Sequence, residues 1–347
     1  MVRTSIKPDF TAVRGDHRLS SFVRACLATG LAALDRDLRP SDVAKRWDNS
    51  RNIEMILRAA VSPTTTNTAP LTQIGVAFLD ALVPISAGAE LLNRGIQLSF
   101  SGTSSITVPA IALPVAGFVG EGHPIPAVTA PTSAGPTMTP HLIKAIALLT
   151  GEVMRSSNAE TLVRQVLIEA TGPALDKVLL STSAATPDAP AGLLNGIAPL
   201  GAAAATADKA IVDDLQVLAT AIAPVAGNSE IVVVASTDAA VALALRMPSR
   251  LTWPVLASVA LAPRTVIAIA ANALVAGVEG APAVEASQFA SVHRETVPGE
   301  IVDLGGVFAR PVASVFQSDL VSLKLRWPLS WALRDPRSVS WMTGVNW

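Results

Sequence analysis

The chain has 347 residues, half of them hydrophobic and only 15% charged, and its mean hydropathy is +0.46. This length allows a large core and two or three domains. No apolar run reaches the ~18 residues that a membrane-spanning helix needs, and the N-terminus, MVRTSIKPDF, lacks a secretory-signal pattern. We therefore expect the apolar excess to lie in contacts with other protein chains, and not in a membrane.

Charge and cysteine content exclude further classes. The net charge of −1 gives no general attraction to nucleic acid, although residues 1–58 hold 11 Lys+Arg against 7 Asp+Glu, a local +4. The single cysteine, Cys26, excludes an intrachain disulfide and a cysteine-based zinc cluster. Its helical context predicts a buried structural thiol.

The first 100 residues read as helices followed by a strand. Apolar spacing predicts one helix over 19–34 and a second that follows Ser41, as its N-cap, to about residue 60. The polar tract 62–70 is typical of a linker. A helix over 73–83 and a strand in LLNRGIQLSF (91–100) complete this part.

Between Arg94 and Lys144 the only charged residue is Glu121. Residues 101–140 are rich in proline, which removes donors from a strand ladder, so they predict a long, weakly paired, two-stranded excursion. Because this excursion has almost no charge, we expect it to lie on protein.

A long helix and an α/β segment follow. Ser157 and Glu160 fit a capping box, an apolar stripe runs from Leu162 to Ala170, and the helix is expected to kink at Gly172-Pro173 and to reach Leu180. Residues 184–200 predict a turn-rich loop. Further elements are expected as helices over 208–223 and 237–247, and as strands over 230–236, 264–274, 299–306, 311–317 and 321–334.

No constellation of catalytic residues emerges. The four histidines are far apart, and GFVGEG (117–122) has neither the dinucleotide nor the P-loop spacing. Asp213 and Asp214 are neighbours on a helix and point to different faces, which excludes a shared-proton dyad. We therefore expect no catalytic, cofactor-binding or metal-binding residues. A hydrolase that uses an isolated serine is a remote alternative.

Five motifs in order resemble the major capsid proteins of tailed bacteriophages, which have the HK-ninety-seven-type fold. The motifs are FVGEGHPIP (118–126), TMTPHLIKAIALLTGEVMRSS (137–157), ALDKVLL (174–180), PAGLLNGI (190–197) and SVFQSDLVSLKLRWPLSWALRDPRSVSWM (314–342). The resemblance spans about residues 59–347 and implies an α+β fold. The implied parts are an N-terminal helical extension (1–61), an N-arm (62–95), an extended loop hairpin (96–140), a peripheral domain (141–200) with a spine helix at about 158–181, an axial domain (201–300) and the return strands of the peripheral domain (301–347).

The resemblance implies a structural protein and no enzyme. Copies would form the pentamers and hexamers of an icosahedral shell in the virion, assembled in the host cytoplasm around double-stranded DNA without sequence-specific contact. A portal, a maturation protease and decoration proteins are possible further partners, whereas cofactors and membranes are not implied. The basic surplus of residues 1–58 would face the lumen or belong to solvated helix faces. An encapsulin-like compartment has the same fold and is the alternative, but the long N-terminal extension and proline-rich loop favour a phage.

In that family the hairpin lies over the neighbouring subunit. Phe118, Glu121, Pro124 and Arg155 are the inter-subunit contact residues that this implies. Glu121 is expected to pair with an arginine, either Arg155 or one of the adjacent chain; a solvent-exposed turn carboxylate is the alternative. Some members link their subunits through a lysine of this loop, but no lysine lies between residues 45 and 144 here. We therefore expect no isopeptide crosslinks.

Overall fold

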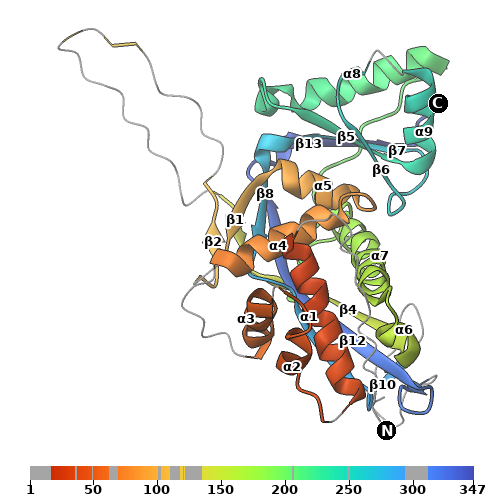
Figure 1. The fold of residues 1–347 in the computed structure, drawn as a ribbon. Coiled ribbons are helices and arrows are strands. Elements are labelled where there is room, and N and C mark those ends of the chain that lie inside the picture. Colours follow the sequence, from red (N-terminus) through yellow and green to blue (C-terminus); the bar gives the residue numbers. More distant parts are fainter. Residues whose placement is uncertain are drawn as a thin grey trace, which may run out of the picture. The chain divides into compact units, whose positions relative to one another are not determined.

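The chain forms two compact units (Figure 1). Unit one comprises Met1–Phe78, Ile143–Ala170 and Ala281–Trp327, and unit two comprises Leu79–Leu142, Thr171–Gly280 and Pro328–Trp347. The computed structural model describes residues 17–35, 37–48, 50–61, 69–100, 103–109, 118–119, 121, 135–204, 207–247, 251–293 and 312–347. Since each unit combines three stretches of sequence, each depends on contacts between residues that are far apart along the chain.

Unit one combines helices from its first stretches with strands from its last. Its helices are α1 (His17–Leu34), α2 (Pro40–Ala44), α3 (Ser50–Val61), most of α4 (Ala69–Leu82), α6 (Gly151–Arg155) and the first part of α7 (Ala159–Leu179). Its strands are most of β4 (His141–Thr150), then β9 (Ala283–Ser287), β10 (Ser291–His293), β11 (Val312–Ser314) and the first part of β12 (Leu320–Leu333). β12 pairs antiparallel with β9, and β10 with β11.

Aromatic rings build the core of unit one. Phe22, Phe78 and Trp327 are buried and meet edge to face, with ring centroids 5.5 Å apart in the first pair and 5.1 Å in the second. Each such pair adds about 0.5–1.5 kcal/mol to the burial of its area. Cys26 is fully buried in α1, and burial raises the pKa of its thiol. The prediction of a buried structural thiol is confirmed.

The helix predicted after Ser41 is wrong in two respects. α2 begins two residues earlier than expected, with Arg39 and not Ser41 as the N-cap residue. Pro40 stands at the first helical position, which proline favours. The helix then ends at Ala44, and α3 starts only at Ser50. The intervening residues include Asp48, whose side chain competes for backbone hydrogen bonds and so weakens a helix interior.

Glu160 does not form the predicted capping box. Its carboxylate accepts a hydrogen bond from Ser20 Oγ at 2.8 Å and another from Arg24 Nε at 3.0 Å. Both oxygens are therefore engaged by α1, and the predicted return of Glu160 to Ser157 is wrong. The pair with Arg24 is three-quarters buried or more at both side chains, so it fixes the start of α7 more firmly than a surface pair would.

α7 has 21 residues and is the longest helix in the described part of the chain. It matches the predicted helix at about 158–181 and continues through Pro173. Val163 and Leu167 are buried but Leu162 is 41% exposed, so the apolar stripe is narrower than the sequence suggested.

In unit two, part of the segment 91–100 that was predicted to be a strand is a helix. Its helices are the end of α4, α5 (Ala87–Arg94), the end of α7, α8 (Ala207–Ala226) and α9 (Thr237–Arg246). α5 covers the first half of LLNRGIQLSF, because Ser86 Oγ accepts from Ala89 N at 3.0 Å and caps the helix. The strand β1 (Ile96–Ser99) starts only after Gly95.

A four-stranded sheet with the order β13-β7-β5-β6 forms one half of unit two. The strands of unit two are β1, β2 (Ile106–Thr107), β3 (Thr137–Met138), β5 (Ile231–Ser236), β6 (Val255–Ser258), β7 (Thr265–Ala270), β8 (Leu274–Val278), the end of β12 and β13 (Val339–Thr343). β5 is parallel to β6 and antiparallel to β7, and β13 is antiparallel to β7. The strand predicted over 264–274 ends at Ala270 as β7, because the 3-10 turn η1 (Ala271–Ala273) follows it, and β8 begins only at Leu274. β8 pairs with β1 and with β12.

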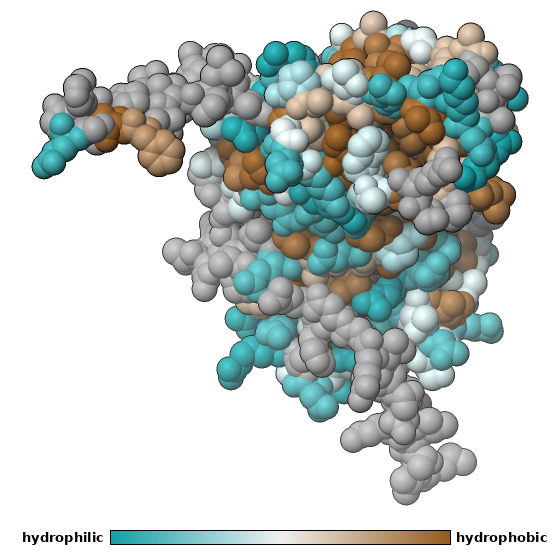
Figure 2. Space-filling model, turned by 90° about the horizontal axis from the view of Figure 1, so that it is seen from above, coloured by the Kyte–Doolittle hydropathy of each residue, from teal (hydrophilic) through white to brown (hydrophobic). Residues whose placement is uncertain are grey.

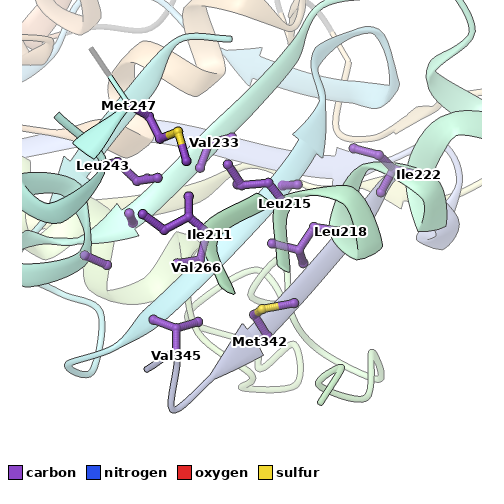
Figure 3. Close-up of a cluster of buried hydrophobic side chains, with 13 residues drawn as sticks. Ile211, Leu215, Leu218, Ile222, Val233, Leu243, Met247, Val266, Met342 and Val345 are labelled. Carbon is purple, nitrogen blue, oxygen red and sulfur yellow. The ribbon is translucent and has the colours of Figure 1, made fainter. Parts of the chain in front are cut away.

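The predicted helices and strands of residues 208–247 are confirmed as α8, β5 and α9. α8 packs against β7 and β13, and α9 packs against β5 and β6. Their inner faces meet in a buried cluster, in which Ile211 and Leu218 come from α8, Leu243 from α9 and Val233 from β5 (Figure 3). Of the later predicted strands, 299–306 lies outside the described residues.

Candidate functional site

The excursion between β2 and β3 is held by a very short pair of strands. Ile106 faces Met138, Thr107 faces Thr137, and the two threonine hydroxyls are 3.2 Å apart. Val108 N also donates to Pro136 O at 3.0 Å. The prediction of a weakly paired two-stranded excursion is confirmed at its base.

A compact apolar cluster anchors this base within unit two. Phe100, Val108, Met138 and Val275 are all buried there. The Phe100 ring lies over Gly277, where an added Cβ would come within 2.3 Å of a ring carbon. Only glycine leaves room for the ring at this point of β8, so the anchor depends on a residue far from the hairpin in sequence.

The predicted inter-subunit residues lie in different surroundings. Phe118 is fully exposed and Glu121 is exposed, both in unit two, whereas Arg155 is exposed in α6 of unit one. Pro124 lies outside the described residues. Glu121 forms no ion pair with any described residue, so its pairing with an arginine stays a prediction. The Phe118 ring is open to contact by another chain.

Asp176 is a buried junction that the sequence did not reveal. It lies on α7, is 1% exposed, and accepts hydrogen bonds from Ser86 Oγ (2.5 Å), Gly88 N (2.8 Å), Ala87 N (3.2 Å) and Ser258 Oγ (2.6 Å). The amide donors are the first N–H groups of α5, so the helix dipole also stabilises the negative charge. One carboxylate therefore ties α7, α5 and the end of β6 together. The only sequence signal was a charge on an apolar helix face.

The acidic pair of α8 behaves as predicted. Asp214 is buried and accepts from Ala203 N at 2.6 Å and from Trp347 Nε1 at 2.8 Å. Asp213 lies on a different, partly exposed face of the helix. The two carboxylates do not share a site, which confirms that they are not an acid–base dyad.

The described residues show neither a cluster of metal ligands nor a membrane-spanning helix. Among them, no three His, Cys, Asp or Glu side chains gather closely enough to hold a metal ion. No described helix has the length and apolar character needed to cross a bilayer. The described surface carries several solvent-exposed apolar side chains (Figure 2). In unit two they include Val212, Val217, Val241, Leu245 and Val259.

Glu279 supplies a pH-dependent prediction. Burial raises the pKa of its carboxyl above the ordinary value, so the folded state favours the protonated form. The stabilisation linked to protonation of Glu279 is fully present below the ordinary glutamate pKa. It is lost as the pH rises through the raised pKa of Glu279 in the folded state. We expect Glu279→Gln to increase the free energy of unfolding at pH 8, by less than about 1 kcal/mol because the carboxyl keeps contact with solvent, and to have less effect at pH 4. Urea titrations at both pH values measure this. An equal effect at both, or the same gain from Asp188→Asn at an exposed site, would contradict it.

Comparison with known proteins supports a capsid fold. No protein-family model matches the chain. Over 94% of its length the chain is 27% identical to the capsid polyprotein of Pseudomonas phage PAJU2, and it spans about half (54%) of that relative. It matches a chain of the satellite phage P4 procapsid, which includes the size determination (Sid) protein, with a TM-score of 0.50 and 11% identity, over 78% of this chain and 98% of that one. A chain from Mycobacterium phage Bobi matches with a TM-score of 0.49 and 16% identity, over 73% and 89%.

Proposed function

We propose that this chain, which has the α+β fold of the tailed-phage capsid proteins, is the major capsid protein of a tailed bacteriophage. Copies of it would assemble into an icosahedral shell around double-stranded DNA. The observation that carries the proposal is the sequence likeness to a phage capsid polyprotein along 94% of the chain. The likeness of fold to almost the whole of a procapsid chain supports it.

The exposed surface supports assembly. A soluble monomer rarely gathers large apolar side chains on exposed helix faces, whereas unit two exposes them on both α8 and α9. Repeated contacts of one surface with a different surface on the next copy close into rings, such as pentamers and hexamers. Each contact can be weak, since every subunit makes several and they act together.

The proposed parts follow the sequence-based division except for β13, which pairs with β7 and so belongs to the axial sheet and not to the return strands of the peripheral domain. α7 is the spine helix, the four-stranded sheet with α8 and α9 forms most of the axial domain, and the excursion from β2 to β3 is the extended loop that reaches a neighbour. The shell would belong to the virion and be assembled in the host cytoplasm. Portal, maturation protease and decoration proteins are further proposed partners, and no catalytic role is proposed for the chain.

The contents of purified particles separate the proposal from its alternative. An encapsulin-like compartment has the same fold but holds protein. Particles are purified from their native source, and nuclease removes any nucleic acid bound to their outer surface. We then expect a high ratio of absorbance at 260 nm to absorbance at 280 nm, because the packaged nucleic acid is protected inside. A ratio typical of protein alone in full particles would favour the compartment.

The extended loop provides a sharper test of subunit contact. If Glu121 pairs with an arginine in the shell, Glu121→Ala leaves that arginine desolvated without a partner and lowers particle yield and melting temperature. Loss of a buried charge partner typically costs about 3–5 kcal/mol, and a rim pair less than 1. Asp188→Ala, at an exposed site in a surface loop, is the matched control. Unchanged yield and melting temperature for Glu121→Ala would rule the pairing out.

The absence of lysine from residues 46–143 predicts shells without covalent links. Mature particles boiled in denaturant should therefore run as single chains on a gel. A ladder of covalent multimers would contradict this.

A further inference from the structure

Two exposed apolar surfaces of unit two carry opposite charges. The first is the α9 ridge, which we define as Val241, Leu245 and Arg246. Val241 is 59% and Leu245 76% exposed; they are four residues apart and so lie on the same face of the helix. Arg246 is exposed beside them and forms no ion pair with any residue that the structure describes. The ridge thus presents an apolar face with an unpaired cation.

The second surface is the α8 groove, which we define by the residues that line it: Leu200, Asp213, Gln216, Val217, Thr220 and Ala221. The groove has a volume of about 540 Å³. Val217 is 45% exposed, and Asp213 forms no ion pair within the described part of the chain. From Leu215 to Asn228 the helix and its end carry no charge, so Asp213 is the groove's one charged residue.

The two surfaces lie toward opposite ends of the four-stranded sheet. α8 packs on β7 and β13, whereas α9 packs on β5 and β6, in the order β13-β7-β5-β6. On α8, Val212 lines a neighbouring cavity with Met247 and Trp253, which follow the end of α9, and this cavity shares Gln216 and Thr220 with the groove. Val217 is five residues further on, about 140° around the helix, so the groove and the cavity lie side by side along α8. In Figure 3 the core side chains of α8 and α9 point into one cluster between them and the sheet.

Surfaces of this kind suit a head-to-tail contact. We propose that in the shell the α9 ridge of one copy packs into the α8 groove of the next copy, with Arg246 paired to Asp213 across the contact. The occupant is a second copy because ridge and groove match in apolar character and carry opposite charges on the same unit. Such a contact repeats in one direction and forms a ring when the rotation from copy to copy closes, as in a pentamer or hexamer. This inference rests on the proposed function and adds the residues that join neighbouring subunits.

Engineered cysteines in the full chain test the contact, because the native Cys26 is fully buried and gives a silent background. We expect the double variant Val217→Cys, Leu245→Cys to form, on oxidation of assembled particles, a ladder of disulfide-linked chains that ends at the ring size. Each single variant should remain unlinked, and co-assembled single variants should give linked dimers only. A short bismaleimide provides a second readout, since a disulfide needs Cα atoms within about 7 Å.

Charge reversal tests the pair itself. Asp213→Arg and Arg246→Asp should each reduce particle yield about tenfold or more, because like charges then face each other across the contact. The double reversal should restore the yield. Neither Asp213 nor Arg246 contributes an ion pair within the described chain, so each single variant is expected to keep the wild-type circular dichroism.

The possible results distinguish a failure of the proposed contact from a failure of the proposed capsid function. If the wild type forms particles but the double cysteine variant links with neither reagent, the contact is wrong and the capsid proposal stands. Dimers formed by Leu245→Cys alone would show a two-fold contact and also overturn the head-to-tail proposal. A wild type that forms no particles would overturn both.

Discussion

Replacement of Asp176 by alanine is expected to lower the free energy of unfolding by about 3–5 kcal/mol. The variant removes the acceptor of four hydrogen bonds and leaves two buried serine hydroxyls and the first amides of α5 without it. Urea unfolding, followed by tryptophan fluorescence, measures the loss. Hydrogen exchange should show it most strongly in the amides of Ala87 and Gly88, which lose their acceptor.

The controls for this prediction lie on the same chain. Asp188→Ala, at an exposed site, should stay within about 0.5 kcal/mol of the wild type, as surface substitutions usually do. Asp176→Asn keeps one acceptor oxygen and should fall between the wild type and the alanine variant. An alanine variant as stable as the control would show that the carboxylate does not hold α5, α7 and β6 together.

Gly277→Ala is expected to lower stability by about 1–3 kcal/mol and to loosen the base of the extended loop. The new methyl group would lie 2.3 Å from Cε2 and 2.6 Å from Cζ of Phe100, so the ring must move. Phe100 packs with Val108 and Met138 at the base of the loop. Faster proteolytic cleavage near this base, together with a lower melting temperature, is the expected result.

A matched glycine and a compensating change keep this prediction falsifiable. Gly201→Ala should have little effect, because no atom lies within 4 Å of the added Cβ. Adding Phe100→Leu to Gly277→Ala frees space at the clash and should recover part of the lost stability. If Gly277→Ala and Gly201→Ala behave alike, the close approach of ring and strand does not matter for the loop.

Elements with a strong period were predictable from the sequence. α7, α8, β5 and α9 came within a few residues of their expected bounds, because apolar positions recur along them at helical or strand spacing. The base of the extended loop was also predictable, since proline limits ladder pairing to short stretches. Local chemistry was enough in these segments.

Features that depend on distant residues were not predictable. The break between α2 and α3 and the end of β7 at a 3-10 turn interrupt patterns that read as continuous. The partner of Glu160 proved to be α1, which no local capping rule can indicate. β13 pairs with β7 and so lies in the sheet of α8 and α9, although only a short 3-10 turn, Pro336–Ser338, separates it from the long β12 in sequence. For Glu160 and for β13 a tertiary contact outweighs the local signal, whereas the break between α2 and α3 lies at residues that weaken a helix interior.

The candidate site also has features that the sequence predicts and features that it does not. Sequence motifs indicated the extended loop and the capsid resemblance, and the low charge indicated contact with other chains. Neither Asp176 nor the α9 ridge was identifiable, because burial and exposure of single side chains depend on the packed fold. Leu245, which is 76% exposed, reads in sequence like any core position of a helix.

The central claim is that copies of this protein form a closed shell. The mass of the species that the purified chain forms in solution tests this claim most directly. Analytical ultracentrifugation combined with electron cryomicroscopy should show closed, icosahedral particles of megadalton mass. A folded, monodisperse species of 35.8 kDa, stable at high concentration under all assembly conditions, would contradict the claim.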